Sequence, residues 1–286
     1  MRFPLLALLA TASSLLSALV LAAQPAAAPP VGPVPLDASC AASLTARVTT
    51  GDDLRVLGCE RTGRGRAVLA VGDPATAASV AVLVPGADID LGTLADPAHP
   101  ERRPLGWARA LQAEAGPDAA VVLWVGYPTP QGLGRDAATG RLARAAVPAL
   151  VEEVARLRDR PGAPPHLTVV GHSYGAVVAA LAADRLPADD LVLLGSPGAR
   201  AADVAALHTR ARVSVARTRG DWIARVPHLA LGDLGHGTDP VSPGFGARRL
   251  ATGEATGHTG YFTPGSTALR SIAAVVTGDA GAGSPR

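Results

Sequence analysis

A serine pentapeptide with glycine at both ends stands between an apolar run and an alanine-rich run of the chain. Residues 166–170 are His-Leu-Thr-Val-Val, residues 171–175 are Gly-His-Ser-Tyr-Gly, and residues 176–186 are mostly Ala, Val and Leu. The first run favours a buried parallel strand, and the last favours a helix packed on the same sheet. A strand, a tight turn flanked by glycines and a helix are the setting of a nucleophile elbow, which exposes the central serine. Ser173 is therefore the first candidate nucleophile, with a chance match in a chain of 32 glycines as the alternative.

Composition limits the class of protein to which this chain can belong. Its 286 residues, 48% of them hydrophobic, can build one α/β domain with a large core. All 26 basic residues of the Lys+Arg count are arginines, and the formal net charge is only +2, without basic runs. Nucleic-acid binding therefore has no support. The spacing of His, Cys and acidic residues predicts no metal site, and we expect no cofactor.

The N-terminal residues predict export. Arg2 precedes an apolar stretch over residues 4–22, which is followed by three alanines and a proline-rich segment. This pattern is typical of a signal peptide, assigned to residues 1–28, with an uncleaved membrane anchor as the alternative. We expect a Pro/Ala-rich linker over residues 29–40, one domain over residues 41–278 and a flexible tail over residues 279–286. The expected location is secreted or associated with the cell envelope.

The two cysteines of the chain both fall in the N-terminal part of the expected mature protein. They are Cys40 and Cys59. An exported chain meets an oxidising compartment in which disulfides persist. We therefore predict a disulfide between them.

The order of apolar and helical patterns predicts a mostly parallel sheet. Strands are expected at 54–60, 66–72 and 79–84, which together form an antiparallel edge, and at 119–125, 166–170, 190–194, 212–217 and 247–252. Helices are expected at 105–115, 138–159, 176–186 and 201–209. Strands that alternate with helices in this way are typical of an α/β fold with helices on both faces of the sheet.

A nucleophilic serine needs a base, and the base needs an acid that holds its tautomer. Asp221 follows the strand expected at 212–217, where a carboxylate would overhang the carboxyl edge of the sheet. A turn residue or helix cap is the alternative for an aspartate in this place. His258 follows the last expected strand and completes the order Ser, Asp, His along the chain.

A second histidine competes for the role of base. His236 precedes the last expected strand, so we expect it to line or shape the entrance of the site, together with His172 and Gly86. Two segments are long enough to cover this entrance, residues 128–140 and residues 228–246.

An oxyanion hole needs two backbone amides aimed at the developing negative charge. One is expected from Tyr174, directly after the serine. The other is expected from Ala87, because Gly86 before it allows close approach of the backbone. An ordinary Pro-Gly turn is the alternative at this second position.

Several ordered motifs resemble one known family. They are Val82-Leu83-Val84-Pro85-Gly86, Trp124-Val125-Gly126-Tyr127 with Pro130, Gly171-His172-Ser173-Tyr174-Gly175, Gly195-Ser196-Pro197-Gly198, His236-Gly237 with Asp239-Pro240, Phe245-Gly246-Ala247, and His258 with Tyr261. From about residue 67 to residue 278 the chain is similar to secreted or membrane-anchored actinobacterial α/β hydrolases that form a domain family of unknown function. The resemblance implies the α/β-hydrolase fold, with Ser173 as nucleophile, Asp221 as acid and His258 as base.

The chain departs from that family after Gly86, where Asp88 and Asp90 stand in place of small or hydroxyl residues. A carboxylate beside the oxyanion hole would oppose the negative charge of the transition state. Residues 196–212 leave room for one short helix, so we expect no large cap domain over the site.

These observations predict a secreted serine hydrolase, similar to esterases and lipases, that cleaves small-molecule or lipid acyl esters through a Ser-His-Asp triad and an acyl-enzyme. The alternatives are a non-catalytic binding protein of the cell envelope on the same scaffold, and an acyltransferase that differs only in its acceptor.

Overall fold

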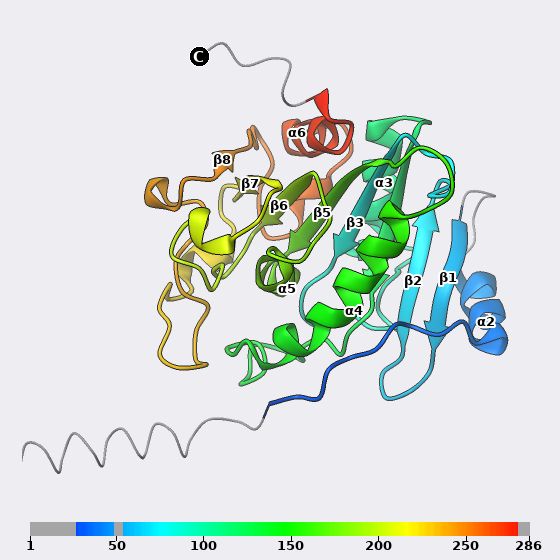
Figure 1. Ribbon diagram of the computed structural model, residues 1–286, viewed down its shortest axis with the longest axis horizontal. Helices are drawn as coiled ribbons and strands as arrows, with labels where there is room; N and C mark the ends of the chain where they lie inside the picture. The colour runs from blue at the N-terminus through cyan, green and yellow to red at the C-terminus, as the bar shows by residue number, and fades with distance from the viewer. Residues whose placement is uncertain (1–26, 49–53, 280–286) are drawn as a thin grey trace, which may run out of the picture.

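One mixed sheet with helices on both faces forms the body of the protein (Figure 1). The computed structural model describes residues 27–48 and 54–279. The strands are β1 (Leu54–Glu60), β2 (Arg66–Val71), β3 (Ser79–Val84), β4 (Ala119–Val125), β5 (His166–His172), β6 (Asp190–Leu194), β7 (Arg212–Ala216) and β8 (Arg248–Arg249). The helices are α2 (Ala38–Val48), α3 (Pro104–Ala115), α4 (Arg141–Arg158), α5 (Tyr174–Ala182) and α6 (Thr267–Val276). The predicted leader before residue 27 and the predicted tail after residue 279 lie outside the described residues.

The strands lie in the order β1-β2-β4-β3-β5-β6-β7-β8. The pairs β1–β2 and β2–β4 are antiparallel, and all other neighbours are parallel. The prediction that β3 belongs to the antiparallel edge is wrong, because β3 runs parallel to both of its neighbours in the middle of the sheet. All six of its residues are buried, as expected for a strand covered on both faces. The predicted α/β-hydrolase fold is otherwise confirmed.

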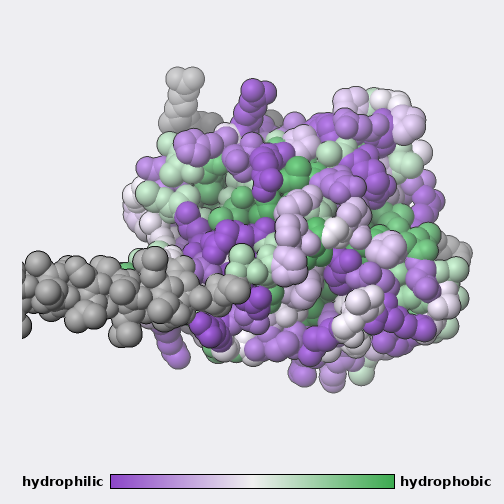
Figure 2. Space-filling model, turned by 60° about the horizontal axis from the view of Figure 1, so that its bottom comes forward, coloured by the Kyte–Doolittle hydropathy of each residue, from purple (hydrophilic) through white to green (hydrophobic). Residues whose placement is uncertain are grey.

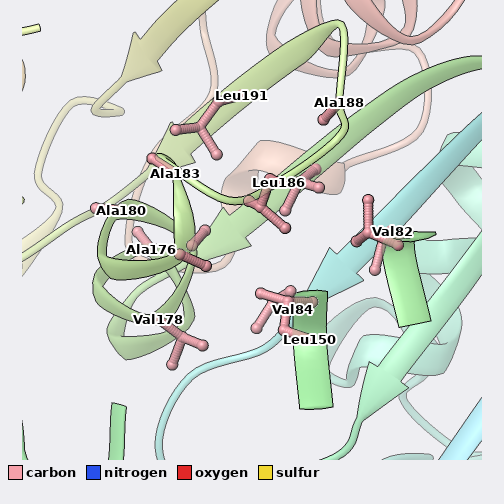
Figure 3. Close-up of a cluster of buried hydrophobic side chains, with 14 of the residues drawn as sticks. Val82, Val84, Leu150, Ala176, Val178, Ala180, Ala183, Leu186, Ala188 and Leu191 are labelled. Carbon is pink, nitrogen blue, oxygen red and sulfur yellow. The ribbon is translucent and has the colours of Figure 1, made fainter. Parts of the chain in front are cut away.

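Two apolar cores hold the helices against the sheet. On one face α4 and α5 pack together, and Figure 3 shows Val84 of β3 and Leu150 of α4 beside Ala176 and Val178 of α5. On the other face α3 and α6 pack together and share a core with α2. The short side chains of α5 allow this helix to approach the sheet closely. Ser173, which precedes α5, is thereby held at the carboxyl edge of the parallel strands.

Four segments differ from the predicted elements. The strand expected at 247–252 is reduced to the two residues of β8, and the helix expected at 201–209 is a single 3-10 turn over Ala205–Leu207. Helix α2 begins at Ala38, within the segment expected to be a linker, and the Val31 amide before it donates to the Ala145 carbonyl of α4. Helix α6 has no predicted counterpart. Within the described ranges, no helix has the length and apolar character needed to cross a bilayer.

A disulfide joins α2 to β1. The Cys40 and Cys59 sulfur atoms are 2.01 Å apart, and both residues are almost fully buried. Their sequence separation of 19 residues closes a loop that includes residues 49–53, which lie outside the described ranges.

We expect the double substitution Cys40→Ser and Cys59→Ser to lower the free energy of unfolding by about 3 kcal/mol, because the unfolded chain regains the entropy that the cross-link removes. Urea unfolding of both proteins at neutral pH measures the difference. The reactivity of Ser173 below the unfolding transition should be retained, since the disulfide lies at edge strand β1, four strands from β5, which Ser173 follows. Equal unfolding midpoints with equal slopes would show that the bond contributes nothing to stability.

Candidate active site

The turn at Ser173 is strained and depends on its two glycines. Ser173 has φ 57° and ψ −126°, which a residue with a side chain rarely adopts. A Cβ at Gly171 would lie 2.6 Å from the Ala176 Cα, and one at Gly175 would lie 2.1 Å from the Val84 carbonyl oxygen. Glycine is therefore required at both flanks, and the strand and the helix can meet at an angle that presents the serine hydroxyl.

The three predicted triad residues lie in one hydrogen-bonded chain. His258 Nε2 is 2.8 Å from Ser173 Oγ, and His258 Nδ1 is 2.8 Å from Asp221 Oδ1. Because a carboxylate only accepts, Nδ1 carries the proton and donates to Asp221, which leaves Nε2 to accept from the Ser173 hydroxyl. Asp221 follows β7 and begins a 3-10 turn over Trp222–Arg225, and its side chain is fully buried.

Tyr261 holds the second oxygen of this carboxylate, a role that the sequence prediction did not include. Its hydroxyl donates to Asp221 Oδ2 at 2.5 Å and accepts the Thr218 amide at 3.3 Å, while Asp221 Oδ1 also accepts the Ile223 amide at 2.9 Å. Burial disfavours the charged carboxylate, but the hydrogen bonds from His258 and Tyr261 outweigh it, so the pKa of Asp221 lies below its usual value. Asp221 therefore stays ionised at neutral pH.

His172 lies beneath the base rather than in the substrate entrance. Its ring is buried against Trp107, and His172 Nε2 is 2.6 Å from the backbone oxygen of His258. Burial, together with repulsion from a charged His258, lowers the pKa of His172 to about 3. A neutral ring can donate from Nε2 to the His258 carbonyl and fix the loop that carries the base. The expectation that His172 contacts substrate is wrong, because the packing of α3 covers its ring.

A buried histidine that stays neutral makes the fold sensitive to acid. The unfolded chain binds a proton at His172 below about pH 6.5 and the folded chain does not, so stability is lost as the pH falls from about 6.5 toward 3. At pH 5, about 1.5 units below the ordinary pKa, this contribution reaches about 2 kcal/mol.

The variant His172→Gln keeps an amide donor but does not titrate. Between pH 7 and pH 5 its free energy of unfolding should therefore fall by about 2 kcal/mol less than that of the wild type. Denaturant titrations at the two pH values measure this. Equal losses in both proteins would mean that the folded protein accommodates a charged imidazole at this position.

The predicted oxyanion hole has the required components beside the serine. A Cβ at Gly86 would lie 2.6 Å from Ser173 Cβ and 3.1 Å from Ser173 Oγ, so only glycine lets this loop pass the nucleophile. The amides of Ala87 and Tyr174 donate to no other residue in the part of the chain that the structure describes. The buried Tyr127 hydroxyl donates to the Pro85 carbonyl at 2.8 Å and fixes the loop.

The two aspartates after Gly86 are bound to other groups of the chain. Asp88 Oδ1 accepts the Gly132 amide at 2.7 Å. Asp90 accepts the amides of Gly92 and Thr93 through Oδ1, and its Oδ2 pairs with the Arg64 guanidinium. These bonds hold both carboxylates in the loops that follow Gly86. The amides and the guanidinium that bind these two carboxylates therefore partly neutralise the negative charge that the sequence places near the oxyanion hole.

His236 does not reach the serine. Its ring is buried, Nε2 lies 2.7 Å from the Ala137 carbonyl, and the ring packs edge-on against Tyr174 with 5.6 Å between the centroids. Together with Tyr174 it lines an apolar pocket of about 500 Å³ between the two segments that we expect to cover the site. Among the described residues no group of three or more His, Cys, Asp or Glu side chains could hold a metal ion.

A mostly parallel sheet with a serine elbow and a histidine paired with a buried aspartate at its carboxyl edge defines the class of α/β hydrolases. Residues 60–231 match the family model described as alpha/beta hydrolase, and the chain belongs to this family.

Two curated relatives are uncharacterized proteins from two strains of Mycobacterium tuberculosis. Each is 35% identical over 250 residues, which cover 76% of this chain but 37% of the relative. The chain thus spans little more than a third of the length of these relatives. Their origin agrees with the resemblance to an actinobacterial group.

Solved structures with a similar fold include hydrolases from distant organisms. Carboxyl esterase 2 from Tuber melanosporum is 13% identical, with 86% of this chain and 99% of that one covered at a TM-score of 0.47. Dienelactone hydrolase from Anabaena variabilis is 18% identical, with 79% and 97% covered at a TM-score of 0.48.

Proposed function

We propose that this protein is a secreted or cell-envelope-associated serine hydrolase that cleaves carboxylic esters through an acyl-enzyme. The observation that carries the proposal is the chain of two 2.8 Å contacts from Ser173 through His258 to a buried, ionised Asp221. An isolated serine hydroxyl is a poor nucleophile at neutral pH, and a base within hydrogen-bond reach activates it.

The reaction proceeds in two halves. Ser173 Oγ attacks the ester carbonyl carbon while its proton moves to His258 Nε2, and the amides of Tyr174 and Ala87 stabilise the negative charge on the carbonyl oxygen. His258 then gives its proton to the leaving alcohol as the ester bond breaks. A water molecule then gives a proton to His258 Nε2 as its oxygen attacks the acyl carbon, and His258 returns the proton to Ser173 Oγ as the acyl–oxygen bond breaks and the acid leaves. Asp221 stabilises the imidazolium in both halves.

Labelling with a fluorophosphonate probe tests the proposal, because the probe reacts only with an activated serine. The wild type should be labelled and Ser173→Ala should not. Ser196→Ala is the matched control, since Ser196 is buried, donates to the Gly198 carbonyl and should not react. Equal labelling of wild type and Ser173→Ala would move the nucleophile elsewhere, and no labelling of a folded wild type would favour a non-catalytic binding protein.

Export is supported by the leader pattern in the sequence and by the disulfide, which is stable in an oxidising compartment. The mass of the protein recovered from culture medium tests it. A mass that corresponds to a start near residue 29 supports cleavage. Recovery of the full chain from the membrane fraction would favour an uncleaved anchor.

A further inference from the structure

The apolar pocket next to His236 borders the reacting centre. Tyr174, which lines the pocket, directly follows Ser173 in the chain. Trp222, on another wall, directly follows Asp221, and its ring centroid lies 4.8 Å from that of His258. Two walls of the pocket therefore belong to neighbours of the triad, and a substrate held at the serine can extend into this space.

The lining of the pocket offers little to a polar ligand. No Asp, Glu, Lys or Arg is among the described residues that line it. The Tyr174 hydroxyl donates to the Thr139 carbonyl at 2.7 Å and accepts the Ala143 amide, and His236 Nε2 contacts the Ala137 carbonyl. The Tyr174 hydroxyl and His236 Nε2 are thus engaged with the protein, and the one buried side-chain atom of the described lining residues that lacks a partner is His236 Nδ1. A pocket with so few free polar groups binds apolar groups.

Exposed hydrophobic side chains gather at the same place. Six large hydrophobic residues are exposed among the described residues, and five of them line this pocket: Leu133, Trp222, Leu229, Leu231 and Leu234. The four leucines are between 57% and 74% exposed. Figure 2, in which the bottom of Figure 1 is turned toward the viewer, shows hydrophobic side chains gathered among hydrophilic ones. Such a cluster marks a binding surface more often than scattered apolar residues do.

An ionic cluster holds the two covering segments together, so the pocket is formed before any ligand binds. The Asp233 carboxylate contacts Arg200 at 2.7 Å, contacts Arg144, and accepts the Gly140 amide at 3.1 Å. The Gly235 amide donates to the Ala138 carbonyl at 2.8 Å. Because a preformed pocket is already ordered, the binding of a flexible hydrocarbon chain costs little free energy for ordering the protein.

We infer that this pocket, with its leucine rim, binds a medium or long hydrocarbon chain of the ester substrate. The inference rests on the proposed function, because it names the substrate class of the same site. The chain can belong to the acyl group or to the alcohol, since both meet at Ser173.

Two series of esters distinguish these sources. In p-nitrophenyl esters from acetate to decanoate only the acyl chain grows, and in alkyl acetates from ethyl to decyl only the alcohol grows. In the series whose chain enters the pocket, kcat/KM should rise about fourfold per methylene, the equivalent of about 0.8 kcal/mol of apolar burial. We expect octanoate, or octyl acetate, to exceed the shortest ester by more than about a hundredfold.

Paired variants test whether the pocket causes the dependence of kcat/KM on chain length. Ala138→Phe places a ring in the pocket, and Leu231→Gln removes an apolar part of the rim. Both should lower the ratio of kcat/KM for the C8 ester to that for the C2 ester, Ala138→Phe by about tenfold or more. The controls are Ala205→Phe and Leu36→Gln, at exposed positions outside the pocket, which should keep the wild-type ratio.

A binding measurement in Ser173→Ala separates this inference from the proposed function. Trp107 and Trp124 are buried, so exposed Trp222 should respond when methyl decanoate fills the pocket, with a blue shift of emission that is absent in Ser173→Ala/Trp222→Phe. If kcat/KM did not change with chain length in either ester series, while Ser173 was labelled and the emission did not shift, the assignment of the pocket would be wrong and the proposed hydrolase would stand. If Ser173 was not labelled but the emission shifted clearly, the proposed hydrolase would be wrong and the pocket would still bind the hydrocarbon chain.

Discussion

Replacement of His258 by alanine is expected to lower kcat by about 10⁵-fold, because among the described residues His258 is the base that contacts the Ser173 hydroxyl. His258 Nε2 lies 2.8 Å from the serine oxygen, whereas the Nε2 of His236 is engaged with the Ala137 carbonyl. His236→Gln, which keeps an amide donor for that carbonyl, should therefore retain turnover within about tenfold and act mainly on KM. Steady-state hydrolysis of a short p-nitrophenyl ester measures both.

Exposed His99 provides the control, since His99→Ala should behave as the wild type. Thermal melts of each variant show whether it is folded. If folded His236→Gln lost turnover and folded His258→Ala kept it, the assignment of the base would move to His236.

Elements made of contiguous buried residues could be predicted from the sequence almost to the residue. The strands β3, β4 and β6 are fully buried runs that end at a turn or a glycine, and they have the predicted bounds. Strand β1 also has the predicted bounds, although only two of its residues are buried. The position of β3 between β4 and β5 could not be predicted in this way. The pattern of a strand shows that both of its faces are buried, but the order of strands depends on where the connecting helices cross the sheet.

The C-terminal part was harder to predict because its signals are short. β8 has two exposed arginines and no apolar run. Helix α6 has the signals of a helix start: the Ser266 side chain accepts the Leu269 amide at its N-terminus, and its buried residues recur at helical spacing. A serine followed by apolar residues at this spacing would have been enough to predict it.

Within the site, chain order and strand ends pointed to the three residues that the structure brings together, because loops after parallel strands meet at one edge of the sheet. The positions of His172 and Tyr261 depend on long-range packing instead. His172 is buried by Trp107 of α3, and Tyr261 reaches Asp221 from a segment 40 residues later. No local pattern encodes either contact.

Two substitutions of Asp221 should differ in severity because of the Ile223 amide. Asp221→Ala removes the group that holds the His258 ring and should lower kcat about 10⁴-fold. In Asp221→Asn the side-chain oxygen is expected to stay at the Oδ1 position, where the Ile223 amide and His258 Nδ1–H both donate. The amide nitrogen then faces the Tyr261 hydroxyl, which must turn its proton away. The tautomer of His258 is kept and only the charge is lost, so we expect a loss of about 10², or about 3 kcal/mol.

The comparison needs both variants to be folded, since Asp221 also accepts the Ile223 amide and so caps the turn after β7. Thermal melts provide this control, and kcat for a short p-nitrophenyl ester provides the readout. The variant Asp221→Asn/Tyr261→Phe removes the hydroxyl whose proton competes for the same side-chain oxygen. The oxygen then has no donor that draws it to the Oδ2 position, so this double variant should lose no more activity than Asp221→Asn. If Asp221→Asn alone were as inactive as Asp221→Ala, the Ile223 amide would not control the orientation of the side chain.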